Sequence, residues 1–536
     1  MTPRQAASAG DSSSQPFVTA SGGQMWRSGR PYRFVGANFW YGLLLDAGRL
    51  ERELDRLAVL SVTNLRVLGA IEELPPPSAH AQPAVQPRPG EFDEALLAGL
   101  DRLLCGARDR GMTVVLVLNN MWQWSGGFAS YVHWAPPPMR SGASDEEWQA
   151  HQAYATRFYS TPAARALYYR YVRMLASRLN SCSGRRYADD PTILAWELAN
   201  EARCEAFAAV KAHRATSWTA RPLAAVEAYR AWVEEAAAVV RSAAPSHLVA
   251  LGSEGPTPWP RYVRTDLRAD HAAVDYVAVH LWPQNWLWYD PRLSAAYLEA
   301  ARSAAAVLGK PLVVEEFGLA REGEQATPRD TAERRPTSGT ASRDAYYRWV
   351  CNTSAALPAA GVNFWAWGGE GRPGSAEAAA SALVPSAELV GDPPHERPGW
   401  YSVYDELALA ESWLLSHSLP PSTRRPAARP LHGGHARLSY TYREVAERWP
   451  SSVGRPGEAL LLCSGVAAAA ALLLRCVLRR RHPPSGEQVG RADAAEDSDR
   501  GQPRSPTRRL FFRRGHRTVS PSCDPLLGYS SQDEVL

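Results

Sequence analysis

The stretch Thr192-Ile193-Leu194-Ala195-Trp196-Glu197-Leu198-Ala199-Asn200-Glu201-Ala202 decides the fold class of this chain. Its apolar first half predicts a buried β-strand, and an Asn-Glu pair follows where that strand ends. In a parallel barrel the carboxyl ends of the strands carry the functional residues. Asn200 and Glu201 are therefore candidate site residues, with an exposed loop carboxylate as the alternative for Glu201. Glu197 lies within the strand, where a buried charge needs a partner.

A second strand-end carboxylate occurs in Pro311-Leu312-Val313-Val314-Glu315-Glu316-Phe317-Gly318. Successive side chains of a strand point to opposite faces, so one of the two glutamates is expected to face the barrel mouth. Glu316 stands closer to the strand end and is the better candidate nucleophile. Glu315 is expected to make a structural hydrogen bond or ion pair. Two strand-end glutamates fit glycosidic bond cleavage, which needs one acid and one carboxylate facing the sugar carbon.

Eight short β-rich runs alternate with helical segments between residues 32 and 370. The runs are Arg33–Ala37, Asn64–Leu68, Thr113–Leu118, Ile193–Leu198, His247–Leu251, Tyr276–His280, Leu312–Glu316 and Val362–Ala366. Helices are predicted at Leu50–Leu60, Phe92–Arg110 and Leu223–Arg241. This alternation predicts an α/β protein of parallel βα units, and eight units predict a (β/α)8 TIM barrel. The longest loops on the active-site face are expected at Ile71–Glu91 and Asn119–Thr161.

The composition is that of an ordinary globular protein, with 45% hydrophobic and 21% charged residues among 536. A formal net charge of +4, carried largely by arginines after residue 421, does not indicate a nucleic-acid enzyme. The 19 tryptophans and 21 tyrosines favour a groove in which sugar rings stack on aromatic faces. Core packing is the alternative explanation for these aromatic residues.

The seven cysteines show no metal-ligand spacing and no disulfide-scaffold density. Cys182 and Cys204 flank the strand that begins at Ile193 at its opposite ends. Five strand residues at roughly 3.3 Å each exceed the roughly 7 Å Cα separation that a disulfide allows. We therefore expect both cysteines to be unpaired.

The chain is expected to divide into five parts. These are a disordered leader at 1–24, the barrel domain at 25–419 with a last helix at Glu406–His417, a Pro/Arg-rich linker at 420–457, a transmembrane helix at 458–478 and a disordered basic tail at 479–536. The segment Ala459–Leu474 carries no charge, and twenty residues at about 1.5 Å each span a bilayer core. The alternative for this segment is a buried helix.

Arginines follow the expected transmembrane segment on its C-terminal side, which places the tail in the cytoplasm and the barrel outside the cell or in a lumen. The expected protein is therefore a single-pass membrane protein. The leader has no apolar h-region and so no recognisable signal peptide. Three explanations stay open: a missing first exon, an unusual export route, or a cytosolic barrel. We favour the first.

Three further residues are candidates by their positions. Arg66 ends the second run and could pair with Glu197 or with the nucleophile. His280 ends the sixth run and could orient a catalytic group or bind a sugar hydroxyl, although simple packing is the alternative. Trp365 lies near the end of the eighth run and could form the floor on which a sugar ring stacks.

Taken together, these motifs resemble those of glycoside hydrolase family 5, and within it the endo-β-1,4-mannanases. The matching segments, in family order from about residue 26 to 415, are 34–42, 63–67, 118–127, 195–203, 275–288, 314–318, 364–369 and 399–405. The resemblance implies a retaining enzyme that hydrolyses internal β-1,4 bonds of mannan or glucomannan, a polysaccharide partner, and neither metal nor organic cofactor. A β-1,4-glucanase of the same family and a catalytically silent carbohydrate receptor anchored in a membrane are the alternatives.

The resemblance also implies roles for single residues. Glu201 would be the general acid/base and Glu316 the nucleophile. The residues implied to bind the substrate or support its binding are Arg66, Asn200, His280, Trp282, Trp365, Trp40 and Asn120. Retention requires the two carboxyl groups to lie about 5 to 5.5 Å apart. Glu201 should be protonated near neutral pH because the charge of Glu316 raises its pKa.

Two positions depart from the family pattern. Many relatives have Pro where this chain has Ala202, directly after the Asn-Glu pair. Many also have Tyr where this chain has Trp282, and that tyrosine bonds the nucleophile. An indole can donate a hydrogen bond but has no acidic hydroxyl, so the tuning of the nucleophile is expected to differ.

Overall fold

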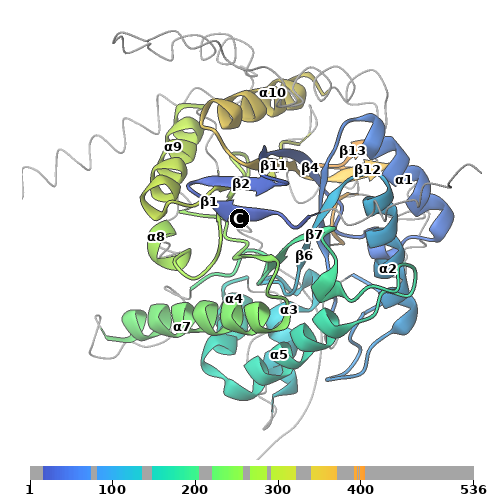
Figure 1. The fold of residues 1–536 in the computed structure, drawn as a ribbon. Helices are drawn as coiled ribbons and strands as arrows, with labels where there is room; N and C mark the ends of the chain where they lie inside the picture. The colour runs from blue at the N-terminus through green and yellow to red at the C-terminus, as the bar shows by residue number, and fades with distance from the viewer. Residues whose placement is uncertain are drawn as a thin grey trace, which may run out of the picture. The chain divides into compact units, whose positions relative to one another are not determined.

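The computed structural model describes residues 16–73, 81–135, 148–204, 220–256, 266–286, 291–320, 340–370, 391–394, 396 and 399–404. All of them belong to Met1–Val453, the first of two compact units into which the chain divides. Eight parallel strands form the central sheet of this unit, in the order β8-β7-β6-β5-β4-β11-β10-β9. Helices surround these strands in a view along the barrel (Figure 1).

The eight central strands coincide with the eight predicted runs to within two residues at either end. They are β4 (Phe34–Asn38), β5 (Asn64–Leu68), β6 (Thr113–Val117), β7 (Ile193–Glu197), β8 (Leu248–Ala250), β9 (Val277–Leu281), β10 (Leu312–Phe317) and β11 (Gly361–Phe364). The first and last of them, β4 and β11, pair with each other. Between β8 and β9, the Asp275 backbone N–H donates to the Val249 carbonyl at 2.8 Å, which nearly closes the barrel. The predicted (β/α)8 architecture is confirmed.

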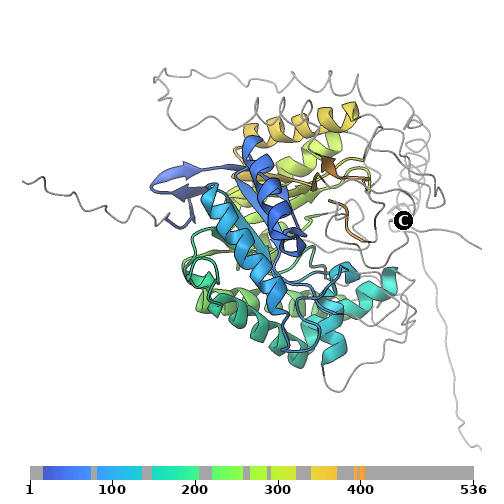
Figure 2. The ribbon, with the colours of Figure 1, turned by 90° about the vertical axis from the view of Figure 1, so that its right-hand side faces the viewer.

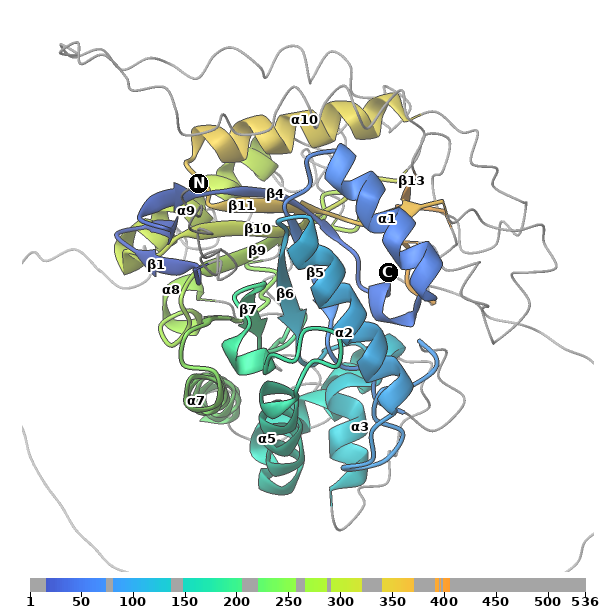
Figure 3. The same cartoon turned by 45° about the vertical axis from the view of Figure 1, so that its right-hand side comes forward.

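The helices pack outside the strands. They are α1 (Ala47–Val59), α2 (Glu94–Asp109), α3 (Gly127–Trp134), α4 (Trp148–Ala155), α5 (Pro162–Ser177), α7 (Ala220–Ala243), α8 (Leu267–Asp270), α9 (Pro291–Leu308) and α10 (Ala341–Ala356). Helix α1 begins where the Asp46 side chain accepts a hydrogen bond from the Arg49 N–H. It buries Leu50, Leu54 and Leu57 on one face, as predicted. Helices α1 and α2 lie side by side (Figure 3).

The segment predicted as a long loop at Asn119–Thr161 contains helices α3 and α4. Helix α3 forms because aromatic residues give it a face to bury. Phe128 and Tyr131 are fully buried, and the Phe128 ring stacks on Phe158 with centroids 4.5 Å apart. The sequence prediction missed this helix because Gly126 and Gly127 at its start, and the prolines at 136–138 that follow it, are typical of loops.

Three short antiparallel strands, β1 (Thr19–Ser21), β2 (Gln24–Arg27) and β3 (Arg30–Tyr32), lie at one end of the barrel (Figure 2). The leader predicted at 1–24 therefore extends too far, because β1 begins inside it. The turn Gly22-Gly23 has φ values of 57° and 76°, which glycine adopts without steric cost in a two-residue hairpin. The hairpin is held by burial of Val18 and Met25.

A short parallel pair, β12 (Trp367–Gly369) and β13 (Val403–Tyr404), follows the last barrel strand. The predicted helix at Glu406–His417, the linker at 420–457, the transmembrane helix at 458–478 and the tail at 479–536 lie outside the described residues. Within the described ranges, no helix combines the length and apolar character needed to cross a bilayer.

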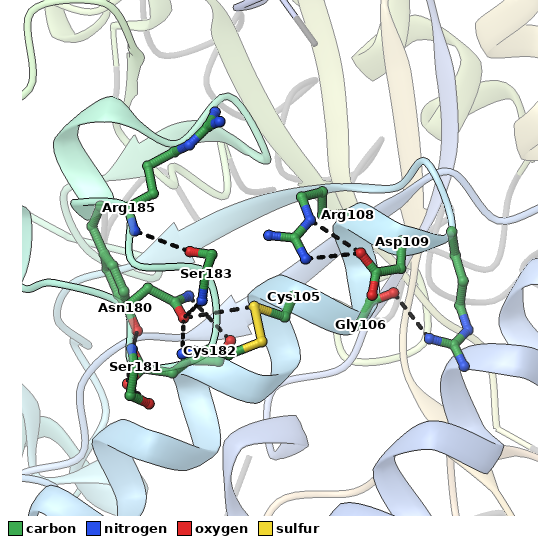
Figure 4. Close-up of a disulfide and its surroundings, with 12 residues drawn as sticks. Cys105, Gly106, Arg108, Asp109, Asn180, Ser181, Cys182, Ser183 and Arg185 are labelled. Carbon is green, nitrogen blue, oxygen red and sulfur yellow. Dashed lines mark hydrogen bonds and ion pairs between the residues drawn. A yellow bond between two sulfur atoms is a disulfide. The ribbon is translucent and has the colours of Figure 1, made fainter. Parts of the chain in front are cut away.

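Cys182 forms a disulfide with Cys105, with the Cα atoms 6.5 Å apart (Figure 4). The expectation that Cys182 is unpaired was therefore wrong, whereas Cys204 is free and buried, as expected. Cys105 lies on α2 and Cys182 in the loop after α5, so the two meet through tertiary packing and not through sequence proximity. Asn180 fixes this loop, because its Oδ1 accepts from the Cys182 N–H at 2.9 Å and its Nδ2 donates to the Asp101 carbonyl at 3.1 Å.

Candidate active site

Glu201 lies directly beyond the C-terminal end of β7, in a backbone conformation that only close packing can maintain. Its φ is +49°, in the left-handed region that non-glycine residues rarely adopt, and its N–H donates to the Gly252 carbonyl at 2.7 Å. Gly252 itself has φ +75°, and a Cβ there would lie 2.2 Å from Glu197 Oε1. Glycine is therefore required beside Glu201, at a position that sequence reasoning did not identify.

Glu316 lies near the end of β10, where the pairing with β9 is irregular. Val314 pairs with Val279, but Glu316 pairs with His280, so Glu315 is the extra residue of a bulge-like shift. The Glu315 carboxylate accepts a hydrogen bond from the Tyr276 hydroxyl at 2.7 Å. Glu315 thus has the structural role predicted for it, within the barrel wall.

The two predicted catalytic glutamates converge on one imidazole. His280 Nδ1 lies 2.8 Å from Glu201 Oε1 and 3.4 Å from Glu316 Oε2. One carboxylate oxygen of Glu201 and one of Glu316 lie within 4.8 Å of each other. This separation suits direct attack on a sugar carbon and is shorter than the roughly 6.5 Å or more that leaves room for an intervening water.

Arg66, the middle residue of the five-residue strand β5, bridges both predicted partners. Its Nε and Nη2 atoms donate to the two oxygens of Glu197 at 2.7 and 2.5 Å, and its Nη1 donates to Glu316 Oε1. Nη2 also donates to Asn200 Oδ1 at 2.8 Å. All four side chains are at least nine-tenths buried, so this guanidinium compensates charges that water does not reach.

The pKa values of the Glu201–His280 pair shift in opposite directions. Burial alone would raise the pKa of Glu201, but the hydrogen bond and positive charge of His280 outweigh it and hold the pKa at about 2. Burial would lower the pKa of His280, but the charge of Glu316 and the bond to Glu201 raise it to about 9. The expectation that Glu201 is itself protonated near neutral pH is therefore not met. The two shifts favour a carboxylate on Glu201 and a protonated His280, one hydrogen bond away.

Glu315 has a pKa raised to about 8, first by burial and then by the negative charge of Glu197. The protonated form is thus favoured in the folded protein, so stability is expected to fall as pH rises from about 4.5 to about 8. Glu315→Gln mimics the protonated form and keeps the oxygen that accepts from Tyr276. Urea unfolding at pH 5, 6.5 and 8 should show a stability difference, variant minus wild type, that grows with pH. A difference independent of pH would contradict a protonated Glu315.

Of the other predicted substrate-binding residues, Trp282 bonds a catalytic carboxylate directly. Trp282 donates from Nε1 to Glu316 Oε2 at 3.1 Å, and its ring packs against that of Trp365 with centroids 5.9 Å apart. Trp40 donates from Nε1 to the Gly391 carbonyl at 2.8 Å. Asn120 is fully buried, and its Oδ1 accepts from Asn200 Nδ2 at 3.1 Å. Asn120 thus contacts Asn200, with which it also forms an isolated backbone bridge.

Sequence reasoning missed a chain of groups on the far side of Glu201. Trp122 donates from Nε1 to Glu201 Oε2 at 2.7 Å, and the Arg203 guanidinium lies 4.5 Å above the Trp122 ring. Arg203 donates from Nη2 to Glu254 Oε2 at 2.7 Å. Burial raises the pKa of Glu254 to about 7 against the opposing charge of Arg203. The position of Glu254 shortly after β8, like that of Glu201 after β7, was the available signal.

A further carboxyl group borders the site from the segment between 391 and 404. The pKa of Glu396 is raised well above its usual range by burial and then by the charges of Asp392, Glu316 and Glu201. In the described part of the chain, the histidine and carboxylate donors that converge closely enough for a metal ion are those of Glu201, His280 and Glu316. These are also the groups that the chemistry below uses.

Comparison with known proteins gives consistent matches over the barrel. The family profile described as "GH family 5 beta-mannosidase-like" matches residues 15–412. Mannan endo-1,4-beta-mannosidase 8 of rice (Oryza sativa subsp. japonica) is 28% identical over 334 residues, which are 56% of this chain and 80% of the rice protein. The putative mannan endo-1,4-beta-mannosidase 9 of rice is 29% identical over 366 residues, 64% of this chain and 78% of that protein.

Among solved structures, the glycoside hydrolase family 5 mannosidase from Rhizomucor miehei is 30% identical, with a TM-score of 0.61. The match covers 75% of this chain and 96% of that one. A variant of that mannosidase, with a glutamate replaced by alanine, was solved in complex with mannosyl-fructose. An endo-β-1,4-mannanase from Thermotoga petrophila, 22% identical with a TM-score of 0.53, shares the fold.

A parallel eight-stranded barrel with two glutamates converging at the ends of β7 and β10 defines a glycoside hydrolase. The profile match covers most of the chain, and the Rhizomucor mannosidase is matched over nearly its whole length. The chain belongs to glycoside hydrolase family 5, in its β-mannosidase-like group.

Proposed function

We propose that this enzyme hydrolyses internal β-1,4-mannosidic bonds of mannan or glucomannan with retention of configuration. The observation that carries the proposal is the approach of Glu201 and Glu316 to within 4.8 Å around His280. The rice relatives that match the barrel are mannan endo-1,4-beta-mannosidases, which supports mannan as the substrate.

In the first step the Glu316 carboxylate attacks the anomeric carbon while the bond from that carbon to the leaving oxygen breaks. Glu201 delivers a proton to the leaving oxygen, and His280 can supply that proton along the 2.8 Å hydrogen bond to Glu201 Oε1. In the second step water attacks the same carbon, Glu201 takes up its proton, and the ester to Glu316 is released. Once Glu316 is esterified its charge is gone, which favours Glu201 as a base.

The neighbouring residues support these two carboxylates. Burial raises the pKa of Glu316, and the hydrogen bonds that Arg66 and the Trp282 indole donate to it oppose that rise by favouring its ionised, nucleophilic form. Asn200, which bonds Arg66 and Asn120, is proposed to bond the 2-hydroxyl of the reacting sugar. Trp365 is proposed as the surface on which that sugar stacks.

Release of single mannose units from chain ends is a second candidate activity. It is favoured by the match to the Rhizomucor mannosidase, at 30% identity over 96% of that chain, and by the group to which the profile belongs. Product analysis separates the two. If the enzyme cuts internal bonds, mannohexaose should yield mannobiose and mannotriose early, and the viscosity of a mannan solution should fall. If mannose is the sole early product, the enzyme instead releases single units from chain ends. Cellulose hydrolysis in preference to mannan would indicate a glucanase, and binding without products a receptor.

We further propose that the barrel matures in an oxidising compartment and is anchored by residues 458–478. The Cys105–Cys182 disulfide supports the first part, because such bonds are rare where thiols are kept reduced. The sequon Asn352-Thr353-Ser354 lies on α10 with Asn352 exposed, as glycosylation in that compartment would need. Carbonate extraction of membranes, combined with enzymatic deglycosylation, tests both parts. A soluble, unglycosylated protein with free Cys105 and Cys182 thiols would contradict them.

A further inference from the structure

Trp282 donates a hydrogen bond to the nucleophile from its indole N–H, and an indole donor places specific demands on its surroundings. A phenol hydroxyl can rotate its O–H bond towards an acceptor, whereas the indole N–H is fixed in the plane of its ring. The 3.1 Å bond from Trp282 Nε1 to Glu316 Oε2 therefore depends on how the whole ring is held.

The indole of Trp282 is packed by partners from three other segments. Tyr401 contacts it edge to face, with centroids 5.1 Å apart and an interplanar angle of 78°. Trp365 also contacts it edge to face, with centroids 5.9 Å apart and an interplanar angle of 73°. At Gly318, a Cβ atom would lie 2.4 Å from Trp282 Cζ3, so the backbone there also follows the ring closely. Trp282 is 8% exposed, which leaves the ring little freedom to tilt.

Tyr401 is itself fastened at both ends. Its hydroxyl donates to Asn285 Oδ1 at 2.7 Å, on the same loop as Trp282, and its backbone N–H donates to Asp392 Oδ1 at 2.6 Å. Asp392 also accepts from the Gly399 N–H at 2.8 Å. Asp392 is thus linked through Tyr401 to the loop that carries Trp282.

We propose that Tyr401 is a positioning residue for the nucleophile, acting through the ring of Trp282 to keep the indole N–H on Glu316. The inference deepens the proposed function, since it takes Glu316 as the nucleophile. Tyr401 does not touch the reacting atoms. It sets the angle at which the Trp282 indole N–H meets Glu316.

The readout is the acidic limb of the pH profile of kcat/KM, which reports the ionisation of the nucleophile in the free enzyme. The charged or titratable groups that face Glu316 are Arg66 from β5, Glu197 and Glu201 from β7 and its end, His280 from β9, and Glu396 from the 391–404 segment. Substitutions at Tyr401 or Trp282 replace none of these charged or titratable side chains. Loss of the indole donor should disfavour the Glu316 carboxylate and move the limb to higher pH.

Trp282→Phe, which removes the N–H, should lower kcat/KM about tenfold and raise the limb by about one pH unit. Tyr401→Phe should move the limb in the same direction by a smaller amount, and Tyr401→Ala by more. In the Trp282→Phe background, Tyr401→Phe should move the limb no further, because its effect passes through the lost donor. Tyr187→Phe is the matched control: it removes another buried hydroxyl bond of 2.7 Å, to Asp101, far from the site.

The proposal is overturned if Tyr401→Phe lowers Tm as Tyr187→Phe does but leaves the limb in place. It is also overturned if the shifts caused by Tyr401→Phe and Trp282→Phe simply add. Tyr401→Phe carries the test even if Tyr401→Ala does not fold. Failure of the catalytic assignment itself would appear differently, as hydrolysis that survives Glu316→Gln.

Discussion

Glu316→Gln should lower kcat on mannan by about five orders of magnitude while the barrel stays folded. An amide has almost the size of the carboxylate and can still accept from Arg66, but it cannot form the ester with the sugar carbon. The measurement is reducing-end release from mannan at enzyme concentrations high enough to detect the residual rate. Tm and binding of mannohexaose should stay close to wild type, which separates lost chemistry from lost structure.

Glu315→Gln is the matched control, because it makes the same change one residue earlier in the same buried strand. Glu315 bonds Tyr276 and not the reacting groups, so its variant should retain hydrolysis. The assignment would be reversed if Glu315→Gln were inactive and Glu316→Gln active. Near-normal turnover by both would remove β10 from the catalytic machinery altogether.

Arg66→Met should be the most destabilising single substitution in the site, at about 3 to 5 kcal/mol. Glu197 is fully buried and both of its oxygens accept from this guanidinium, so removing Arg66 leaves an uncompensated charge inside the barrel. Arg66→Lys keeps the charge but cannot reach Glu197, Glu316 and Asn200 together. It should fold with a lower Tm and lose at least about a hundredfold in kcat. Urea unfolding and mannan hydrolysis check the two effects.

Arg52→Lys is the control for the arginine substitution. Arg52 is exposed and bonds Glu370 through Nε and Nη2 at 3.1 and 2.6 Å, so its geometry resembles that of the Arg66–Glu197 pair without the burial. Solvent screens such pairs, and Tm should not change. If Arg66→Lys proved as harmless as Arg52→Lys, the bridging role of Arg66 would be wrong.

Glu201 and Glu316 differ in chemical role because different side chains surround them, and not because they lie on different strands. Glu316 faces the fixed charge of Arg66, whereas Glu201 faces His280, Trp122 and, behind it, Arg203. A proton can therefore be delivered to Glu201 through His280, while the permanent charge of Arg66 favours an ionised Glu316. This asymmetry provides an acid on one side of the bond and a nucleophile on the other.

The sequence by itself determined the strands and the strand-end glutamates. Runs such as Ile193–Glu197 and Leu312–Phe317 can be recognised from the sequence because a short apolar run is itself the signal of a buried strand. The polar side chains at the ends of such strands mark the catalytic face of the barrel. The resemblance to glycoside hydrolase family 5 also indicated Arg66, Asn200, His280 and Trp365 as candidate site residues. These features depend on order along the chain, which the sequence states directly.

Only the tertiary structure decided which atoms meet. The bond of His280 to Glu201, the donation of Trp122 to the same carboxylate, and the Cys105–Cys182 disulfide join segments that lie 77 to 79 residues apart. The pKa shifts of Glu201 and His280 follow from burial and from distances of a few ångströms to charged neighbours. Neither burial nor such distances can be read from local sequence. The lowered pKa of Glu201 and the raised pKa of His280, against the expectation for Glu201, are the clearest result of that difference.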